Sequence, residues 1–163
     1  MPDPQPFKQT RQPRELRLVA EFLASQYPNE RVMTQVRLGP INPTMSRPEL
    51  TNAERMVIGN FRRSADGVVL LRDWVLIVEG YMVPHLGKAS QLLAYMRLFP
   101  TTPELKEFSG LPIRGLLVGP IEDPILSRTA SDFFIGFQLF RPDWAVEYLK
   151  GFGGRFQRDR SSG

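Results

Sequence analysis

The spacing of hydrophobic residues along the chain alternates between the period of a helix and that of a strand. Leu16, Val19, Phe22 and Leu23 recur at helical spacing and predict an amphipathic helix over 14–25. Short apolar runs that end at glycine or proline are typical of strands. The predicted elements are, in order, a helix over 14–25, a strand over 31–38, a short helix from Asn52, strands over 66–71 and 74–83, a helix over 88–99, a strand over 113–118, a helix over 123–131, a strand over 134–140 and a helix over 142–150.

This order of elements predicts an α/β fold, with a single domain and a mixed central sheet flanked by helices on both faces. A chain of 163 residues is long enough for one such core. The first residues are rich in proline and predict an extended N-terminal arm over 1–13. The folded domain is expected over 14–150, followed by a basic C-terminal tail over 151–163.

The two central strands are joined by only two residues, Arg72 and Asp73, which predicts a tight hairpin. If the residues that flank this turn pair with each other, the register of the hairpin is fixed, because side chains alternate between the two faces of a strand. In this register Asp66 lies directly opposite Glu79, so the two carboxylates share one face of the sheet.

Glu79 differs from the rest of its strand, which is apolar on both faces. Such a strand is expected at the centre of its sheet, where a carboxylate is costly unless it is paired or liganded. Directly opposed side chains have Cβ atoms about 4.5 to 5.5 Å apart, and like charges at that distance repel. A divalent cation such as Mg²⁺, a shared proton or a nearby base would each compensate for this repulsion.

The helix over 88–99 carries a second group of candidate residues along the edge of its core-facing stripe. At about 100° per residue, Lys88, Gln91, Tyr95 and Phe99 lie within about 80° of one another. We expect this edge of the helix to face the acidic pair.

Composition and charge narrow the possible chemistry. The chain has no cysteine and His85 is its only histidine, which excludes cysteine nucleophiles and the usual zinc sites. Serine-hydrolase, P-loop and dinucleotide-binding motifs do not occur in the sequence. The formal net charge of +4 is modest and favours an anionic partner.

Three short motifs follow one another along the chain: ADGVV at 65–69, VEGY at 78–81 and QLLAY at 91–95. In turn they resemble the second-strand aspartate, the E-x-K strand and the Q-x-x-x-Y helix of the RecB-like branch of the PD-(D/E)xK nuclease superfamily. The resemblance covers 14–144 and implies a restriction-endonuclease-like core. More loosely, 63–144 is similar to small proteins of tailed phages.

In that superfamily the aspartate and the glutamate hold Mg²⁺, and the lysine positions and activates the attacking water. The resemblance therefore implies that Asp66 and Glu79 are the metal ligands. Tyr81 stands where the lysine is expected, and a tyrosine is neutral at physiological pH. Lys88 is the expected replacement, with the arginines at 62–63 as alternatives.

The two ends of the chain indicate partners. The C-terminal segment interleaves aromatic residues with Arg155, Arg158 and Arg160, a pattern that suits nucleic acid or an anionic protein groove. Terminal segments of this kind become ordered when a partner holds them. We therefore expect other virion proteins or a homo-oligomeric ring as partners, and double-stranded DNA as a further one.

Our first functional hypothesis is a phage virion structural or assembly protein of the neck, tail or head-completion type. In this hypothesis the nuclease-like fold is kept and its catalytic centre is incomplete. The alternative is an active Mg²⁺-dependent DNA endo- or exonuclease with Asp66, Glu79 and Lys88 as catalytic residues. The sequence shows no signal peptide or transmembrane segment, so the expected location is the host cytoplasm during assembly and then the virion.

Overall fold

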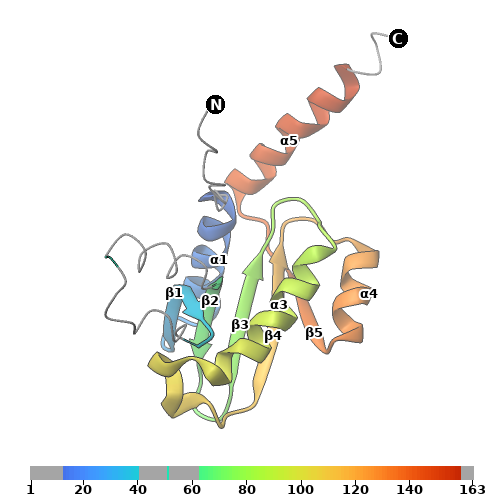
Figure 1. Cartoon of the computed structure of the whole chain (residues 1–163). Helices are drawn as coiled ribbons and strands as arrows, with labels where there is room; N and C mark the ends of the chain where they lie inside the picture. The colour runs from blue at the N-terminus through green and yellow to red at the C-terminus, as the bar shows by residue number, and fades with distance from the viewer. Residues whose placement is uncertain (1–12, 41–50, 52–62, 159–163) are drawn as a thin grey trace.

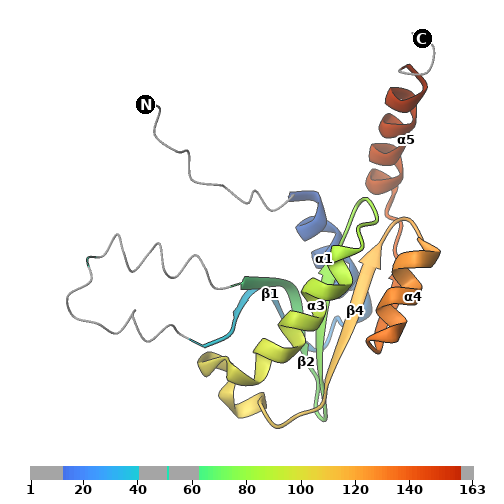
Figure 2. The same cartoon turned by 45° about the vertical axis from the view of Figure 1, so that its right-hand side comes forward.

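The computed structural model describes residues 13–40, 51 and 63–158. A central sheet has helices on both of its faces, and the last helix extends away from the sheet (Figures 1 and 2). The arm up to residue 12 and the short helix expected from Asn52 lie outside the described residues.

The strands form one five-stranded sheet in the order β1-β2-β3-β4-β5. The first three strands form an antiparallel meander, and the last three run parallel. The α/β fold with a mixed sheet, predicted from the order of elements, is therefore confirmed. The strands are β1 (Arg31–Leu38), β2 (Arg63–Leu70), β3 (Val75–Gly80), β4 (Ile113–Gly119) and β5 (Ile135–Leu139).

The helices close to the sheet agree with their predicted positions to within a few residues. No regular element was predicted between the helix over 88–99 and the strand over 113–118. The chain forms two short 3₁₀ helices there, because Pro100 and Pro103 fix a helical φ in their first turns. The helices are α1 (Pro13–Gln26), α3 (Gly87–Leu98), η2 (Phe99–Thr101), η3 (Pro103–Phe108), α4 (Pro124–Asp132) and α5 (Asp143–Arg158).

Strand β3 lies at the centre of the sheet, as predicted, and all six of its residues are buried. Helix α1 packs on one face of the sheet, whereas α3 and α4 pack on the other (Figure 1). The α1 face includes Val19, Phe22, Leu23, Val69, Leu76, Val78 and Val118. The α3 and α4 face includes Val68, Ile77, Ala89, Leu92, Leu117, Leu126 and Ala130. The apolar character of β3 on both sides thus reflects two separate cores.

The predicted hairpin register is also confirmed. The Leu71 N–H donates to the Trp74 carbonyl over 3.0 Å and closes the two-residue turn. Paired residues then run from Leu70 opposite Val75 to Gly67 opposite Val78. The next step along both strands is Asp66 and Glu79, so the hairpin brings the two carboxylates to the same point of the sheet.

Helix α5 is anchored to α1 near its beginning. The Trp144 indole N–H donates to Glu21 Oε2 over 2.7 Å, and this hydrogen bond holds the pKa of Glu21 below its usual range. The Arg17 guanidinium lies over the Trp144 ring, 4.3 Å from its centroid. Beyond this contact α5 continues to Arg158, so its end lies within the 151–163 segment that we described as a basic tail. No helix in the described part of the chain is both long and apolar enough to cross a membrane.

Two glycines beside the acidic residues let α1 approach the sheet closely. A Cβ on Gly67 would lie 2.6 Å from Leu23 Cδ1. A Cβ on Gly80 would lie 2.6 Å from Val19 Cγ2 and 3.1 Å from the Glu15 backbone oxygen. Any larger residue at these positions would push α1 outward, because contacts this short force the neighbouring atoms to move.

Substituting Gly80→Ala is therefore expected to lower the free energy of unfolding by about 1 to 3 kcal/mol, since the added methyl group overpacks the α1 interface. Urea denaturation of the two proteins measures the difference. Gly110→Ala is the matched control, because a Cβ there meets nothing within 4 Å. Equal losses of stability in the two variants would contradict close packing at Gly80.

Candidate active site

The centre of the candidate site is the pair formed by Asp66 and Glu79, which are 5% and 1% exposed. Glu79 Oε1 accepts a hydrogen bond from the Asp66 backbone N–H over 3.0 Å. In return, Asp66 Oδ2 accepts one from the Gly80 backbone N–H, also over 3.0 Å. Each carboxylate thus binds the backbone of the other strand, which fixes both side chains and satisfies part of their need for donors.

The sheet is also irregular at this point where β2 pairs with β1. The β1–β2 register passes from Thr34 opposite Gly67 to Val36 opposite Ala65 and skips the position of Gln35. Gln35 has a φ of 53°, which is uncommon for a residue other than glycine. The regular strand geometry is therefore broken where the acidic pair lies, as is common at functional sites.

Lys88 brings a positive charge from α3 to this pair. Its Nζ lies 3.0 Å from Glu15 Oε2 and 3.6 Å from Glu79 Oε2. The side chains of Lys88 and Glu15 are only 15% and 18% exposed. A lysine in the first turn of a helix is disfavoured by the helix dipole, so the carboxylates must supply the attraction that holds it there.

The charge of Lys88 is stable over a wide pH range. Burial lowers its pKa, but the attraction of Glu79, Glu15 and Asp66 outweighs burial and raises the pKa above the usual 10.5. Because the pKa is raised in the folded protein, the ion pair is fully present below the usual lysine pKa and is lost only as pH rises through the raised value. At neutral pH Lys88 is a cation.

Tyr81, at the lysine position of the E-x-K motif, points away from the acidic pair. It is 0% exposed and its hydroxyl donates to the Ile121 carbonyl over 2.6 Å. Its ring stacks with that of Phe137, with centroids 6.2 Å apart. Burial, with smaller effects of Asp123 and Glu122, raises its pKa, so Tyr81 stays neutral well into the alkaline range. Position 81 is a core position, and a lysine there would be buried among apolar groups.

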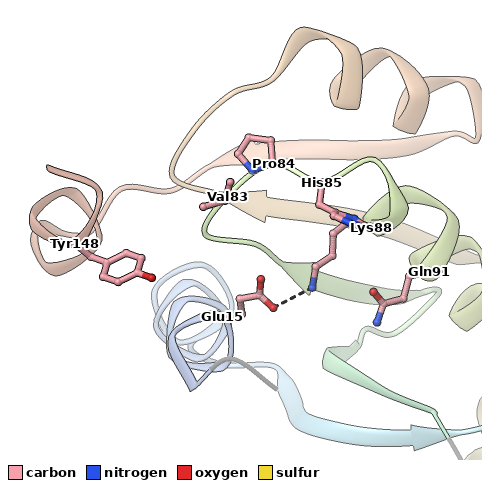
Figure 3. A pocket seen from close by; sticks show the side chains of 7 residues that line it. All are labelled: Glu15, Val83, Pro84, His85, Lys88, Gln91 and Tyr148. Atoms are coloured by element: carbon pink, nitrogen blue, oxygen red, sulfur yellow. Dashed lines mark hydrogen bonds and ion pairs between the residues drawn. The ribbon is translucent and has the colours of Figure 1, made fainter. Parts of the chain in front are cut away.

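A pocket of about 340 Å³ opens over Lys88 and Glu15 (Figure 3). Asp66 and Glu79 do not line it, and Glu79 is linked to it through Lys88, which contacts both Glu79 and the pocket residue Glu15. Helix α5 contributes Tyr148 to one side. The lining residues are Glu15, Val83, Pro84, His85, Lys88, Gln91 and Tyr148.

Gln91 and Tyr95 interact with each other along the edge of α3. The Gln91 side-chain amide donates to the Tyr95 hydroxyl over 2.6 Å. Gln91 also lines the pocket beside Lys88, whereas Tyr95 and Phe99 are buried in the core. The predicted edge of α3 therefore divides, with its first part at the pocket and its last part in the core.

The basic residues of the C-terminal segment lie elsewhere. Arg155 and Arg158 belong to α5, which leads away from the sheet (Figure 2), and Arg160 lies outside the described residues.

Glu15 is the site residue that the sequence did not indicate. It makes the shortest contact to Lys88, 3.0 Å against 3.6 Å for Glu79. Its position follows from the close approach of α1 at Gly80, which depends on tertiary packing. The only local signal is an acidic residue in the first turn of the helix, which many helices have.

The acidic residues do not form a complete metal cage. In the part of the chain that the structure describes, no group of three or more aspartate, glutamate or histidine side chains is arranged to hold a metal ion. A cation at this site would need oxygen atoms from water or substrate in addition to the protein carboxylates.

Comparison with known proteins gives one structural match. No protein-family model and no curated protein matches the chain. The crystal structure of a repair endonuclease from Pyrococcus abyssi is similar with a TM-score of 0.48 and 17% sequence identity. The match covers 77% of this chain and 46% of that chain, so this chain spans less than half of that protein. At this identity the likeness is one of fold alone.

The contact between Lys88 and Glu79 can be tested through stability. Replacing Lys88 by methionine is expected to lower the free energy of unfolding at neutral pH by about 3 kcal/mol, because buried Glu79 loses a cation. The double substitution Lys88→Met with Glu79→Gln should recover most of this loss, since no charge at position 79 then needs compensation. Chemical denaturation of both proteins measures the difference. If the single and double variants are equally unstable, the charge contact contributes nothing.

Proposed function

We propose that this chain is a Mg²⁺-dependent nuclease of the PD-(D/E)xK type, similar to its RecB-like branch, in which Lys88 of α3 takes the role of the E-x-K lysine. The observation that carries the proposal is the position of Lys88 Nζ, 3.6 Å from Glu79 Oε2 and on the wall of the pocket. The loss of the lysine at position 81 therefore does not remove the positive charge from the site.

The two central carboxylates suit a hard divalent cation. Mg²⁺ is held in many enzymes by one or two carboxylates and completes its coordination with water and substrate phosphate. Asp66 and Glu79 supply such a pair from adjacent strands, and a cationic group already lies beside Glu79. When bound, Mg²⁺ would neutralise charge on the phosphate and polarise its oxygen atoms.

Lys88 would act as a charged hydrogen-bond donor. Its Nζ contacts Glu15 and Glu79 as an ammonium group does, which donates hydrogen bonds and carries a positive charge. A fixed ammonium group beside the pocket can stabilise the negative charge that develops on the phosphate oxygens. Glu15 would hold Nζ in place through its 3.0 Å contact. The overall reaction adds water across one P–O bond and yields a phosphomonoester and an alcohol.

The substrate class that we propose is DNA. A phosphodiester carries the negative charge that Lys88 can contact, and the pocket of about 340 Å³ has room for a single nucleotide. Substrate would enter beside Lys88, since this residue both lines the pocket and contacts Glu79. On binding, Lys88 would then exchange a carboxylate partner for the phosphate of the substrate.

The virion hypothesis has less support. It relied on an incomplete catalytic centre and on partners that hold the chain ends. Lys88 supplies a cation beside Glu79, at the centre that this hypothesis took to be incomplete. A phage origin, virion partners and a place in the host cytoplasm stay predictions from the sequence.

The experiment is hydrolysis of linear, circular and branched DNA with Mg²⁺ or Mn²⁺, with EDTA as the blank. The wild-type protein is expected to cut, and Asp66→Asn to cut at least about 100-fold more slowly, because a ligand for the cation is lost. Mn²⁺ should also raise the melting temperature of the wild type and not that of Asp66→Asn, which reports binding apart from turnover.

Tyr81→Phe is the matched control for this assay. It removes a hydroxyl that bonds only to the Ile121 carbonyl in the described structure, so it should lower stability by about 1 kcal/mol and leave the rate of hydrolysis unchanged. The proposal is wrong if wild-type protein cuts none of the substrates with either metal, or if Asp66→Asn cuts as fast as wild type.

A further inference from the structure

The two edges of the sheet differ in how they are protected from pairing with another chain. At one edge, β1 carries Arg31 and Arg37 and is interrupted at Gln35, whose φ is 53°. Charged side chains and local distortions are the usual devices that keep an edge strand from pairing. The β1 edge is therefore protected.

The β5 edge lacks these devices. Its sequence from Phe133 to Phe140, FFIGFQLF, contains no charged residue and no proline. Among the described residues no strand pairs with its outer side. Phe134 is 93% exposed and Leu139 is 43% exposed. An uncharged apolar edge of this kind aggregates unless something covers it.

The backbone groups available on this edge can be assigned. The Phe140 N–H donates to the Gly119 carbonyl over 3.0 Å, so the backbone of Phe140 faces β4. Because successive residues of a strand turn their backbone groups to opposite sides, Ile135, Phe137 and Leu139 direct theirs away from the sheet. Three alternate residues of β5 thus present their backbone outward, and the Leu139 carbonyl accepts an exposed hydrogen bond from the Gln138 side-chain amide over 3.2 Å, which a partner strand would replace.

We propose that a second copy of this chain covers the edge, through antiparallel pairing of β5 with β5 around a two-fold axis at Phe137. This register places Ile135 of one copy opposite Leu139 of the other. The residues that direct their backbone groups outward in one copy thus face the corresponding residues of the other copy, as hydrogen bonding in an antiparallel ladder requires. The result is one continuous sheet of two domains with an isologous interface.

Charge at the two ends of the segment favours this antiparallel arrangement. Asp132 precedes the uncharged run and Arg141 follows it, and both are exposed. Antiparallel pairing brings the acidic end of each copy near the basic end of the other, whereas parallel pairing would bring like charges together. Complementary charges of this kind fix the register of an interface.

Phe134 provides a second observation. It has a φ of 59°, which costs of order 1 to 3 kcal/mol for a residue other than glycine, and its side chain has almost no contact in one copy. A large apolar residue held in this way on the surface is expected where it contacts a partner. Its neighbour Phe133, at the C-terminal end of α4, is 37% exposed as well. This inference does not depend on nuclease activity.

The test is the molar mass of the full chain, measured by light scattering and by sedimentation over a range of concentrations. The wild-type protein is expected to be a dimer that dissociates on dilution. Leu139→Lys places a charge opposite an apolar residue at both ends of the ladder and should raise the dissociation constant by at least about tenfold. Phe134→Lys should weaken the dimer as well, without touching the core.

Leu86→Lys is the matched control, because Leu86 is also an exposed apolar residue, 54% exposed, but it precedes α3 and is not part of the β5 segment. It should leave the dissociation constant unchanged, and thermal melting should show that all variants are folded. A wild-type monomer at every concentration would overturn the proposal, as would a dimer that both β5 variants leave intact. In the first case, β5 would be covered by another part of this chain or by a different protein.

Discussion

The structure depends most on how one buried carboxylate is compensated. Glu79 is 1% exposed in the central strand of the sheet, between two apolar cores. An unpaired charge in such a place would oppose folding by several kcal/mol. The backbone N–H of Asp66 and the ammonium group of Lys88 compensate it, and each requires a neighbouring element to be in its observed place. The hairpin and α3 are therefore positioned by the charge of Glu79, which is also one of the two carboxylates of the candidate active site.

Close packing of α1 completes this arrangement. Glycines at 67 and 80 leave no Cβ between the helix and the strands, and Glu15 at the start of α1 thereby reaches Lys88. Glu79, Glu15 and Asp66, which attract Lys88, also raise its pKa and keep it protonated. Packing and electrostatics thus act together, because the short distance sets the strength of the attraction.

The sequence predicted the features that follow from local geometry. The register of the β2–β3 hairpin follows from the two-residue turn and from the alternation of side chains, so Asp66 and Glu79 could be paired without a structure. The helical period likewise placed Lys88 on the edge of α3 that meets them. Glu15 could not be predicted, because the way α1 crosses the sheet depends on contacts with distant strands. Tyr81 keeps the alternation of β3 and lies in the same core as Val75 and Ile77, but its ring packs against Gly119 of β4, a direction that the alternation of faces alone does not give.

The central claim is that Lys88 replaces the lysine of the E-x-K motif. The rate of a single turnover of DNA hydrolysis, measured for wild type, Lys88→Arg and Lys88→Met at saturating Mg²⁺, tests it most directly. We expect Lys88→Met to be slower by about 100-fold, because it lacks the charge that stabilises the transition state, and Lys88→Arg to fall between the two. A folded Lys88→Met protein that cuts DNA at the wild-type rate would contradict the account.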